Sequence, residues 1–276
     1  MREYLLGLYE KSMPNDLSLP EKLRETKAAG FDYLELSVDE TAEKLARLDW
    51  DDEMIHALNQ AQAQTGIPIK SMCLSGHRKF PLGSEQEEIV VASLEIMEKA
   101  VILASKLGIR IIQLAGYDTY YDEGNSRTRA IFGENLKKAT AMAAKEGIML
   151  GFETMETPFM NTVGKAMEWV REIYSPYLQV YPDVGNLTNA SLLHEEDVVV
   201  DLEKGAGHLV AVHLKETVPG AYREIPYGTG HVDFARVVQA AWDLGVRMFV
   251  GEFWYTGESN WREINHENNL FLRSFF

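Results

Sequence analysis

The sequence predicts an α/β protein that folds as a single (β/α)8 barrel, also called a TIM barrel. Short apolar segments rich in β-branched and aromatic residues alternate with longer helical patterns along the whole chain. Eight such units follow one another in 276 residues, which is close to the roughly 250 residues of this barrel. The alternation favours parallel strands with crossover helices, and eight units favour closure. We therefore expect one domain over residues 1–276.

Each expected strand is a short apolar run followed by a polar or glycine-containing loop. These runs lie at residues 4–9, 33–37, 69–74, 109–114, 148–152, 178–181, 208–214 and 248–251.

The expected helices lie between these strands, and several of them end at a glycine, which is a common C-terminal signal. Pro20 is compatible with the first turn of the first helix. We expect these helices at residues 18–30, 52–65, 84–107, 127–145, 162–173, 197–205, 233–244 and from 260 onward.

The composition of the chain limits the classes of partner that it can bind. The net charge of −15 argues against nucleic acid or an anionic membrane as the main partner, because both require a basic face. No apolar run is long enough to span a bilayer, and the single cysteine, Cys73, suits a reducing compartment. We expect a cytoplasmic protein that acts on a small molecule.

Four polar residues stand at or just after the ends of four successive expected strands: Glu153, Asp183, His213 and Glu252. Their spacings are 30, 30 and 39 residues, which matches one strand–helix unit each. A lone carboxylate in such a place is more often a helix N-cap than a ligand. Four of them in phase instead predict a site with three oxygen donors and one nitrogen donor for a divalent cation.

Several segments closely resemble the L-ribulose-5-phosphate 3-epimerases, also called L-xylulose-5-phosphate 3-epimerases, among the xylose-isomerase-like barrels. They lie at residues 31–40, 72–78, 113–118, 181–187 and 212–217. The resemblance implies a metal-dependent isomerase of bacterial pentose phosphate metabolism or ascorbate degradation. It also implies a homodimer, and it places the metal ligands on the four residues found from spacing.

The sequence departs from the wider group of ketose 3-epimerases that act on unphosphorylated sugars. Those enzymes have a histidine three positions after the aspartate ligand and an arginine six positions after the histidine ligand. This chain has Asn186 and Pro219 at these places. A free hexulose is therefore not the expected substrate. Lys215 and Glu156 are the expected replacement contacts, with Asn186 beside them.

Epimerisation at C3 requires removal of a proton next to the C2 ketone and its return on the opposite face. A divalent ion on the C2 and C3 oxygens would stabilise the enediolate as a Lewis acid. Glu153 and Glu252 are the expected bases on the two faces. Asp183 and His213 are expected mainly to hold the ion. Zn²⁺ or Mn²⁺ is the expected ion, and Co²⁺ and Mg²⁺ are compatible with the same ligands.

The substrate phosphate needs local positive charge, which the loop after the third strand supplies. Ser75, His77 and Arg78 are the expected contacts there, with Lys11 from the loop after the first strand. Barrels more often bind phosphate after strands seven and eight, so residues 228–230 form a competing site. Tyr117 is expected on the pocket wall.

Other functions stay open at this point. An epimerase or an aldose–ketose isomerase of another sugar or sugar phosphate would use the same kind of metal site. An apurinic endonuclease-type hydrolase would need several zinc ions and a basic DNA-binding face, which the acidic composition disfavours. A non-catalytic sugar-phosphate binder would bind the ligand without turnover.

Overall fold

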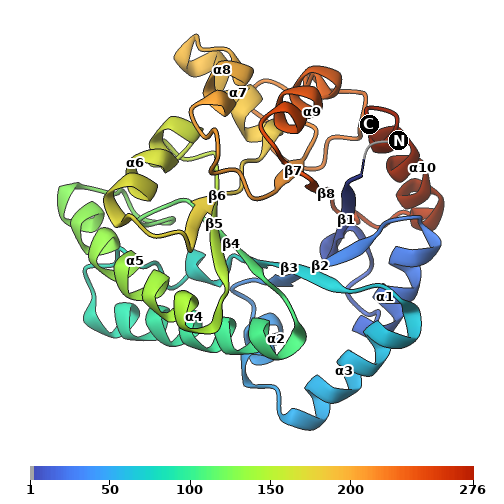
Figure 1. Ribbon diagram of the computed structural model, residues 1–276, viewed down its shortest axis with the longest axis horizontal. Helices are drawn as coiled ribbons and strands as arrows, with labels where there is room; N and C mark the ends of the chain where they lie inside the picture. The colour runs from blue at the N-terminus through green and yellow to red at the C-terminus, as the bar shows by residue number, and fades with distance from the viewer. Residues whose placement is uncertain (1–2) are drawn as a thin grey trace.

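The computed structural model describes residues 3–276, and its eight parallel strands curl into a barrel (Figure 1). The strands are β1 (Leu5–Tyr9), β2 (Tyr33–Val38), β3 (Ile69–Leu74), β4 (Ile111–Ala115), β5 (Met149–Glu153), β6 (Leu178–Val180), β7 (Val212–Leu214) and β8 (Met248–Gly251). The sheet order runs β6-β5-β4-β3-β2-β1-β8-β7. Isolated parallel bridges, Val180 to Leu209 and Asp183 to His213, connect its two ends. The predicted (β/α)8 barrel is confirmed.

The longer helices surround the strands as an outer layer (Figure 1). They are α1 (Leu19–Ala28), α3 (Asp52–Thr65), α4 (Glu87–Leu107), α5 (Ser126–Glu146), α6 (Val163–Ile173), α7 (Val184–His194), α8 (Val198–Glu203), α9 (Phe234–Asp243) and α10 (Trp261–Arg273). A short helix, α2 (Ala42–Leu45), follows β2, and 3-10 turns cover Glu10–Ser12, Ala46–Asp49 and Gly76–Arg78. Within residues 3–276, no helix is long and apolar enough to cross a membrane.

Most predicted elements agree with the structure to within a few residues, but the segment after β6 differs. The sequence predicted one helix at 197–205, whereas two helices, α7 and α8, follow β6. Residues of α7 are buried on more than one side, so its sequence lacks the one-sided apolar pattern of a surface helix. Its N-cap is Asp183, whose Oδ1 accepts from the Asn186 amide at 2.7 Å.

The barrel has an apolar outer layer and a partly polar interior. Leu34 and Leu36 of β2 belong to the main hydrophobic core, together with residues of the surrounding helices. Because side chains alternate along a strand, Glu35 points the other way, into the barrel. It lies there with Tyr181 and Ser71, to which it is hydrogen-bonded. The polar interior leads directly to the four strand ends where the predicted ligands lie.

The two ends of the described chain lie side by side (Figure 1). The ring of Phe276 stacks on that of Tyr4, with the centroids 3.9 Å apart. Helix α10 thus covers the barrel next to β1 and completes the outer layer.

Candidate metal centre and active site

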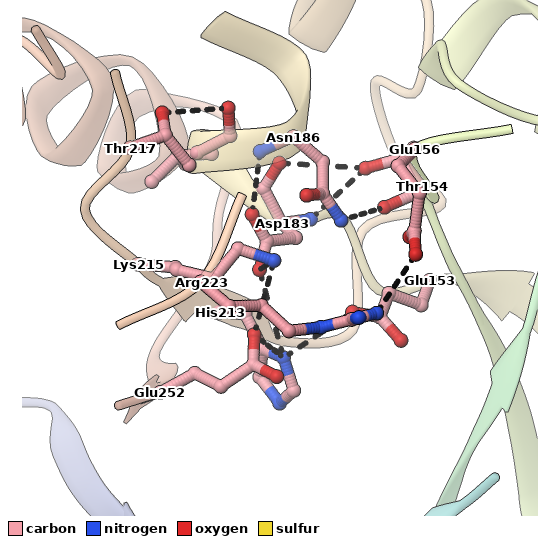
Figure 2. A network of polar contacts seen from close by, with 12 residues as sticks. Glu153, Thr154, Glu156, Asp183, Asn186, His213, Lys215, Thr217, Arg223 and Glu252 are labelled. Atoms are coloured by element: carbon pink, nitrogen blue, oxygen red, sulfur yellow. Dashed lines mark hydrogen bonds and ion pairs between the residues drawn. The ribbon is translucent and has the colours of Figure 1, made fainter. Parts of the chain in front are cut away.

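The structure brings the four predicted metal ligands together. Glu153 is the last residue of β5, Asp183 follows β6, His213 lies in β7 and Glu252 follows β8. All four are buried, and one possible ligand atom from each lies within 4.8 Å of the others. Figure 2 shows Glu153 and Glu252 entering the site from opposite sides. Four consecutive units of the barrel therefore converge on one point.

The two ring nitrogens of His213 have different surroundings. Nδ1 faces the carboxylates, at 3.1 Å from Glu252 Oε2, 3.9 Å from Glu153 Oε1 and 4.0 Å from Asp183 Oδ2. Nε2 faces away from them and lies 2.6 Å from Glu35 Oε1. Nδ1 is therefore the atom of His213 that could bind a cation together with the carboxylates.

The three ligand carboxylates raise a problem of charge. Burial, reinforced by repulsion from Glu252, raises the pKa of Glu153 to about 8. Burial also raises the pKa of Asp183 to about 7. Although burial opposes it, Lys215 and His213 hold the pKa of Glu252 well below its usual value. The site can therefore carry all three negative charges only with additional positive charge.

The donor set fits a divalent cation. Asp183 Oδ2 is buried without a hydrogen bond, although Lys215 Nζ lies 2.9 Å away. Lys215 Nζ is also 3.5 Å from Glu252 Oε2, so one ammonium group serves two carboxylates. Carboxylate oxygens with one imidazole nitrogen are suitable ligands for Mn²⁺, Zn²⁺, Co²⁺ or Mg²⁺. A divalent cation would supply positive charge in addition to the single ammonium group of Lys215.

A cavity of about 160 Å³ opens next to these ligands. Pockets for drug-sized molecules measure about 300 to 1,000 Å³, so this one suits a smaller molecule. The predicted contacts that line it are Lys11, Ser75, Arg78, Glu156, Asn186 and Lys215.

Arg78 lines the cavity and has no carboxylate partner among the ion pairs of residues 3–276. Its guanidinium stacks 4.6 Å from the ring centroid of Tyr120, while its buried Nε has no hydrogen-bond partner. Lys11 has an internal partner, since its Nζ lies 2.5 Å from Asp39 Oδ2. Arg78 is therefore the freer of the two cations.

Two predicted contacts lie elsewhere. His77 does not line the cavity; its side chain is buried and its Nε2 lies 3.1 Å from the Ser93 carbonyl. Burial lowers the pKa of His77 to about 4, so it offers no positive charge near neutral pH. Tyr117 is also buried, with its ring centroid 5.1 Å from that of Tyr120, and it is not part of the cavity wall. Neither position favours the predicted substrate contact.

The competing phosphate site at residues 228–230 is already filled by an internal carboxylate. Glu216 accepts from the amides of Gly228 at 3.0 Å and Val232 at 3.1 Å. A Cβ on Gly230 would come within 2.3 Å of Glu216 Oε1. A negative side chain thus occupies this turn, which favours the loop after β3 for an anion.

Two charged residues of the site were not predicted from the sequence. Arg223 lines the cavity, and its Nη2 lies 2.7 Å from Glu156 Oε1 (Figure 2). It belongs to the loop after β7, where the sequence pointed only to Pro219 and to the glycines of residues 228–230. Glu35 contacts His213 from inside the barrel. A carboxylate in the middle of an apolar strand was the signal for it.

Comparison with known proteins agrees with this architecture. The family model described as xylose isomerase-like TIM barrel matches residues 23–274. The L-ribulose-5-phosphate 3-epimerase UlaE of Shigella boydii serotype 18 is 47% identical over 231 residues, which cover 84% of this chain and 80% of that protein. The enzyme of the same name from Salmonella typhimurium is 48% identical over 231 residues, which again cover 84% of this chain and 80% of that protein.

A solved structure shares the fold at low sequence identity. The D-allulose 3-epimerase from Methylomonas sp. has a TM-score of 0.79 and 18% identity, and the match covers 100% of this chain and 98% of that one. The curated relatives are 3-epimerases, so the expected enzyme class, an isomerase, is confirmed. The chain belongs to the family of the L-ribulose-5-phosphate 3-epimerases within the xylose isomerase-like TIM barrels.

Proposed function

We propose that the protein is a metal-dependent 3-epimerase of a ketopentose 5-phosphate, acting on L-ribulose 5-phosphate and L-xylulose 5-phosphate. The observation that carries this proposal is the convergence of Glu153 and Glu252, from β5 and the end of β8, on the point where the proposed cation site lies. Inversion at C3 needs a base on each face of the sugar, and two carboxylates that enter from opposite sides (Figure 2) meet this need.

The four predicted ligands have two different roles in this proposal. When bound, a divalent cation supplies Lewis-acid stabilisation of the negative charge that develops on the C2 oxygen. Glu153 and Glu252 take and return the C3 proton on the two faces. Asp183 and His213 hold the cation, and Lys215 offsets carboxylate charge from its position 2.9 Å from Asp183.

Contacts to the sugar hydroxyls come from amide and carboxylate groups of the cavity wall. Asn186 Nδ2 donates to the Thr154 carbonyl at 2.7 Å, while its buried Oδ1 has no hydrogen-bond partner. This oxygen is available to accept from a sugar hydroxyl. Glu156, paired with Arg223 and with the Tyr120 hydroxyl, can accept from another.

The phosphate is bound by the loop after β3 in this proposal. Arg78 and Ser75 line the cavity there, with Lys11 on the neighbouring loop and Arg223 on the loop after β7. A phosphate monoester carries about 1.5 to 2 negative charges near neutral pH, and arginine is well suited to bind it. This cationic wall supports a phosphorylated substrate over a free sugar.

The protein is first loaded with Mn²⁺ or Zn²⁺ and then diluted into D₂O that contains one ketopentose 5-phosphate. The test is to follow the sugar by proton NMR. We expect loss of the C3 proton signal together with appearance of the C3 epimer. Exchange at C1 with formation of an aldose would instead identify an aldose–ketose isomerase. Binding without exchange under any metal would identify a non-catalytic binder, and either result would refute the proposal.

A further inference from the structure

A buried carboxylate stands behind the predicted metal ligands, on the side away from the cavity. Glu35 of β2 is fully buried, and it does not line the cavity. Its Oε1 lies 2.6 Å from His213 Nε2. Its Oε2 accepts from Ser71 Oγ at 2.6 Å and from the Tyr181 hydroxyl at 2.9 Å.

This arrangement costs free energy unless every donor is well placed. A carboxylate buried in an apolar interior is unfavourable without hydrogen bonds to its oxygens. Glu35 receives these bonds from three other strands or strand ends, on β3, β6 and β7. Two of the three contacts fix the carboxylate itself, and the third fixes the imidazole of His213.

The contact with Glu35 determines the orientation of the His213 ring. A cation at the ligand cluster would take the lone pair of Nδ1, which without it lies 3.1 Å from Glu252 Oε2. The single proton of the neutral imidazole would then be on Nε2, 2.6 Å from Glu35 Oε1, which can accept it. The ring is then held with Nε2–H toward Glu35 and with Nδ1 toward Glu153, Asp183 and Glu252. The rings of Tyr181 and His213 also pack edge to face, with centroids 4.9 Å apart, which restricts ring rotation further.

We propose that Glu35 is a positioning residue for the metal centre. It holds His213 in the Nε2–H form, so that Nδ1 is the nitrogen presented to a divalent cation, and it makes the imidazole a stronger ligand. A carboxylate that accepts from a ligand histidine generally has this effect. The inference rests on the cation site of the proposed function, but not on which sugar the enzyme accepts.

Cation affinity is the main test, measured with Zn²⁺ in competition with a chelator of known affinity. The substitution Glu35→Gln removes the charge and keeps the size. We expect the dissociation constant to rise about tenfold to a hundredfold. Asp201→Asn is the matched control, because Asp201 is also a buried carboxylate, which accepts from the Val163 and Gly164 amides at the start of α6 and does not touch His213. The control should bind Zn²⁺ as the wild type does.

A spectroscopic measurement separates positioning from a loss of structure. In Zn²⁺-loaded wild-type protein, ¹⁵N NMR of the histidine rings should show His213 with a proton on Nε2 and the cation on Nδ1. If Glu35→Gln does not fold, Ser71→Ala removes one anchor of Glu35 instead and should weaken Zn²⁺ binding severalfold.

The outcomes are distinguishable. A wild-type protein that binds no divalent cation would overturn the proposed function and this inference with it. A wild-type protein that binds Zn²⁺ through Nε2 of His213 would overturn the inference alone. So would unchanged Zn²⁺ affinity in folded Glu35→Gln, and in Ser71→Ala where that variant replaces it.

Discussion

Two clusters of charged side chains are buried in this barrel, and they are built in opposite ways. The ligand cluster consists of Glu153, Asp183, His213 and Glu252. The Glu10 cluster consists of one carboxylate, Glu10, surrounded by Lys22, Lys44 and Arg47. The first has an excess of negative groups around one point, whereas the second has an excess of positive groups around one carboxylate.

Their hydrogen bonding also differs. Both oxygens of Glu10 accept bonds, from Arg47 at 2.6 and 2.8 Å, from the two lysines, and from the Ser37 amide at 2.9 Å. The pKa of Glu10 lies far below its usual value, because Arg47 and the lysines outweigh the effect of burial. In the ligand cluster, by contrast, Asp183 Oδ2 is buried without a hydrogen bond, and the pKa values of Glu153 and Asp183 are raised.

The difference teaches how to recognise a functional cluster. Burial and charge are common to both, so neither property is diagnostic. The Glu10 cluster supplies its own counter-ions, as a structural role requires. It does not line the cavity at the ligand cluster, although Arg47 borders a separate one. The ligand cluster has one ammonium group, Lys215, for three carboxylates, leaves Asp183 Oδ2 without a hydrogen bond and borders the cavity that its own residues line. Those three properties together indicate a site for a cation and a substrate.

Removal of a base from the ligand cluster should give the largest effect on catalysis. We expect Glu153→Gln and Glu252→Gln each to lower kcat for epimerisation by about 10²- to 10⁴-fold, the usual contribution of a general base. A variant that keeps one base can still exchange the C3 proton with D₂O while failing to invert. The metal content of each variant is measured alongside, because both residues are also proposed metal ligands. Near wild-type turnover in either variant would refute the two-base assignment.

Removal of the central carboxylate of the Glu10 cluster should affect stability instead. Glu10→Gln leaves Lys22, Lys44 and Arg47 buried around a neutral group, and breaking a buried pair in this way costs about 3 to 5 kcal/mol. The measurement is urea unfolding monitored by circular dichroism. Glu43→Gln, at an exposed position of α2, is the control and should change the unfolding free energy by less than about 0.5 kcal/mol. An equally small change in Glu10→Gln would show that the cluster is not stabilising.

The two clusters should also respond to pH in opposite directions. Glu153 and Asp183, with pKa values of about 8 and 7, hold protons in the folded metal-free protein that the unfolded chain releases above about pH 4.3. Metal-free protein should therefore lose stability as the pH rises toward 8. The pKa of Glu10 is lowered, so its contribution is present above about pH 4.3 and is lost only at lower pH.

Binding of a divalent cation at the ligand cluster should restore the stability that the metal-free protein loses as the pH rises. Binding requires ionised carboxylates, so the rise in Tm with Mn²⁺ should be larger at pH 8 than at pH 6. A concentration of 100 to 1,000 times Kd stabilises by about 2.7 to 4.1 kcal/mol. Thermal unfolding with EDTA and with Mn²⁺ at both pH values is the measurement. An equal Mn²⁺ effect at pH 6 and pH 8 would contradict the raised pKa values of this cluster.

The ligand cluster could be predicted from sequence because it follows the repeat of the fold. Each βα unit takes about the same length, so residues such as Glu153 and Asp183 fall in register at strand ends. The sequence alternatives for Asp183, helix N-cap or metal ligand, are not exclusive in the structure. Oδ1 caps α7 while Oδ2 faces the other ligands. One side chain has two oxygens, and the sequence pattern does not separate them.

Other features depend on contacts that no periodic pattern encodes. Arg223 lies on the loop after β7, whose path is fixed in part by bonds from Glu216 to distant amides. The opposite directions of His77 and Arg78 are set by a single 3-10 turn, which places one toward α4 and the other in the cavity wall. Neighbouring basic residues therefore looked equivalent in sequence although only one is positioned to meet an anion.

Arg78 belongs to neither cluster, and its substitution should give the smallest of the effects predicted here. It is a cation with no carboxylate partner among the described ion pairs of residues 3–276, and its guanidinium lies on the ring of Tyr120 at the cavity. If it binds the substrate phosphate, Arg78→Ala should raise KM for the ketopentose 5-phosphate about ten- to a hundredfold. That range corresponds to about 1.5 to 3 kcal/mol for one charge-assisted contact.

The decisive comparison for Arg78 is between the phosphorylated sugar and the free sugar. Loss of a phosphate contact should leave the poor turnover of the free ketopentose unchanged, because that substrate never made the contact. Lys79→Ala is the matched control, since Lys79 is exposed and outside the cavity wall, and it should leave KM as in the wild type. Equal losses on both sugars would mean that Arg78 supports the pocket itself, through Tyr120, and that the phosphate binds elsewhere. Steady-state kinetics on the two sugars, with unfolding curves to show that each variant is folded, therefore separates a substrate-binding cation from one that serves only the fold, as the Glu10 cluster does.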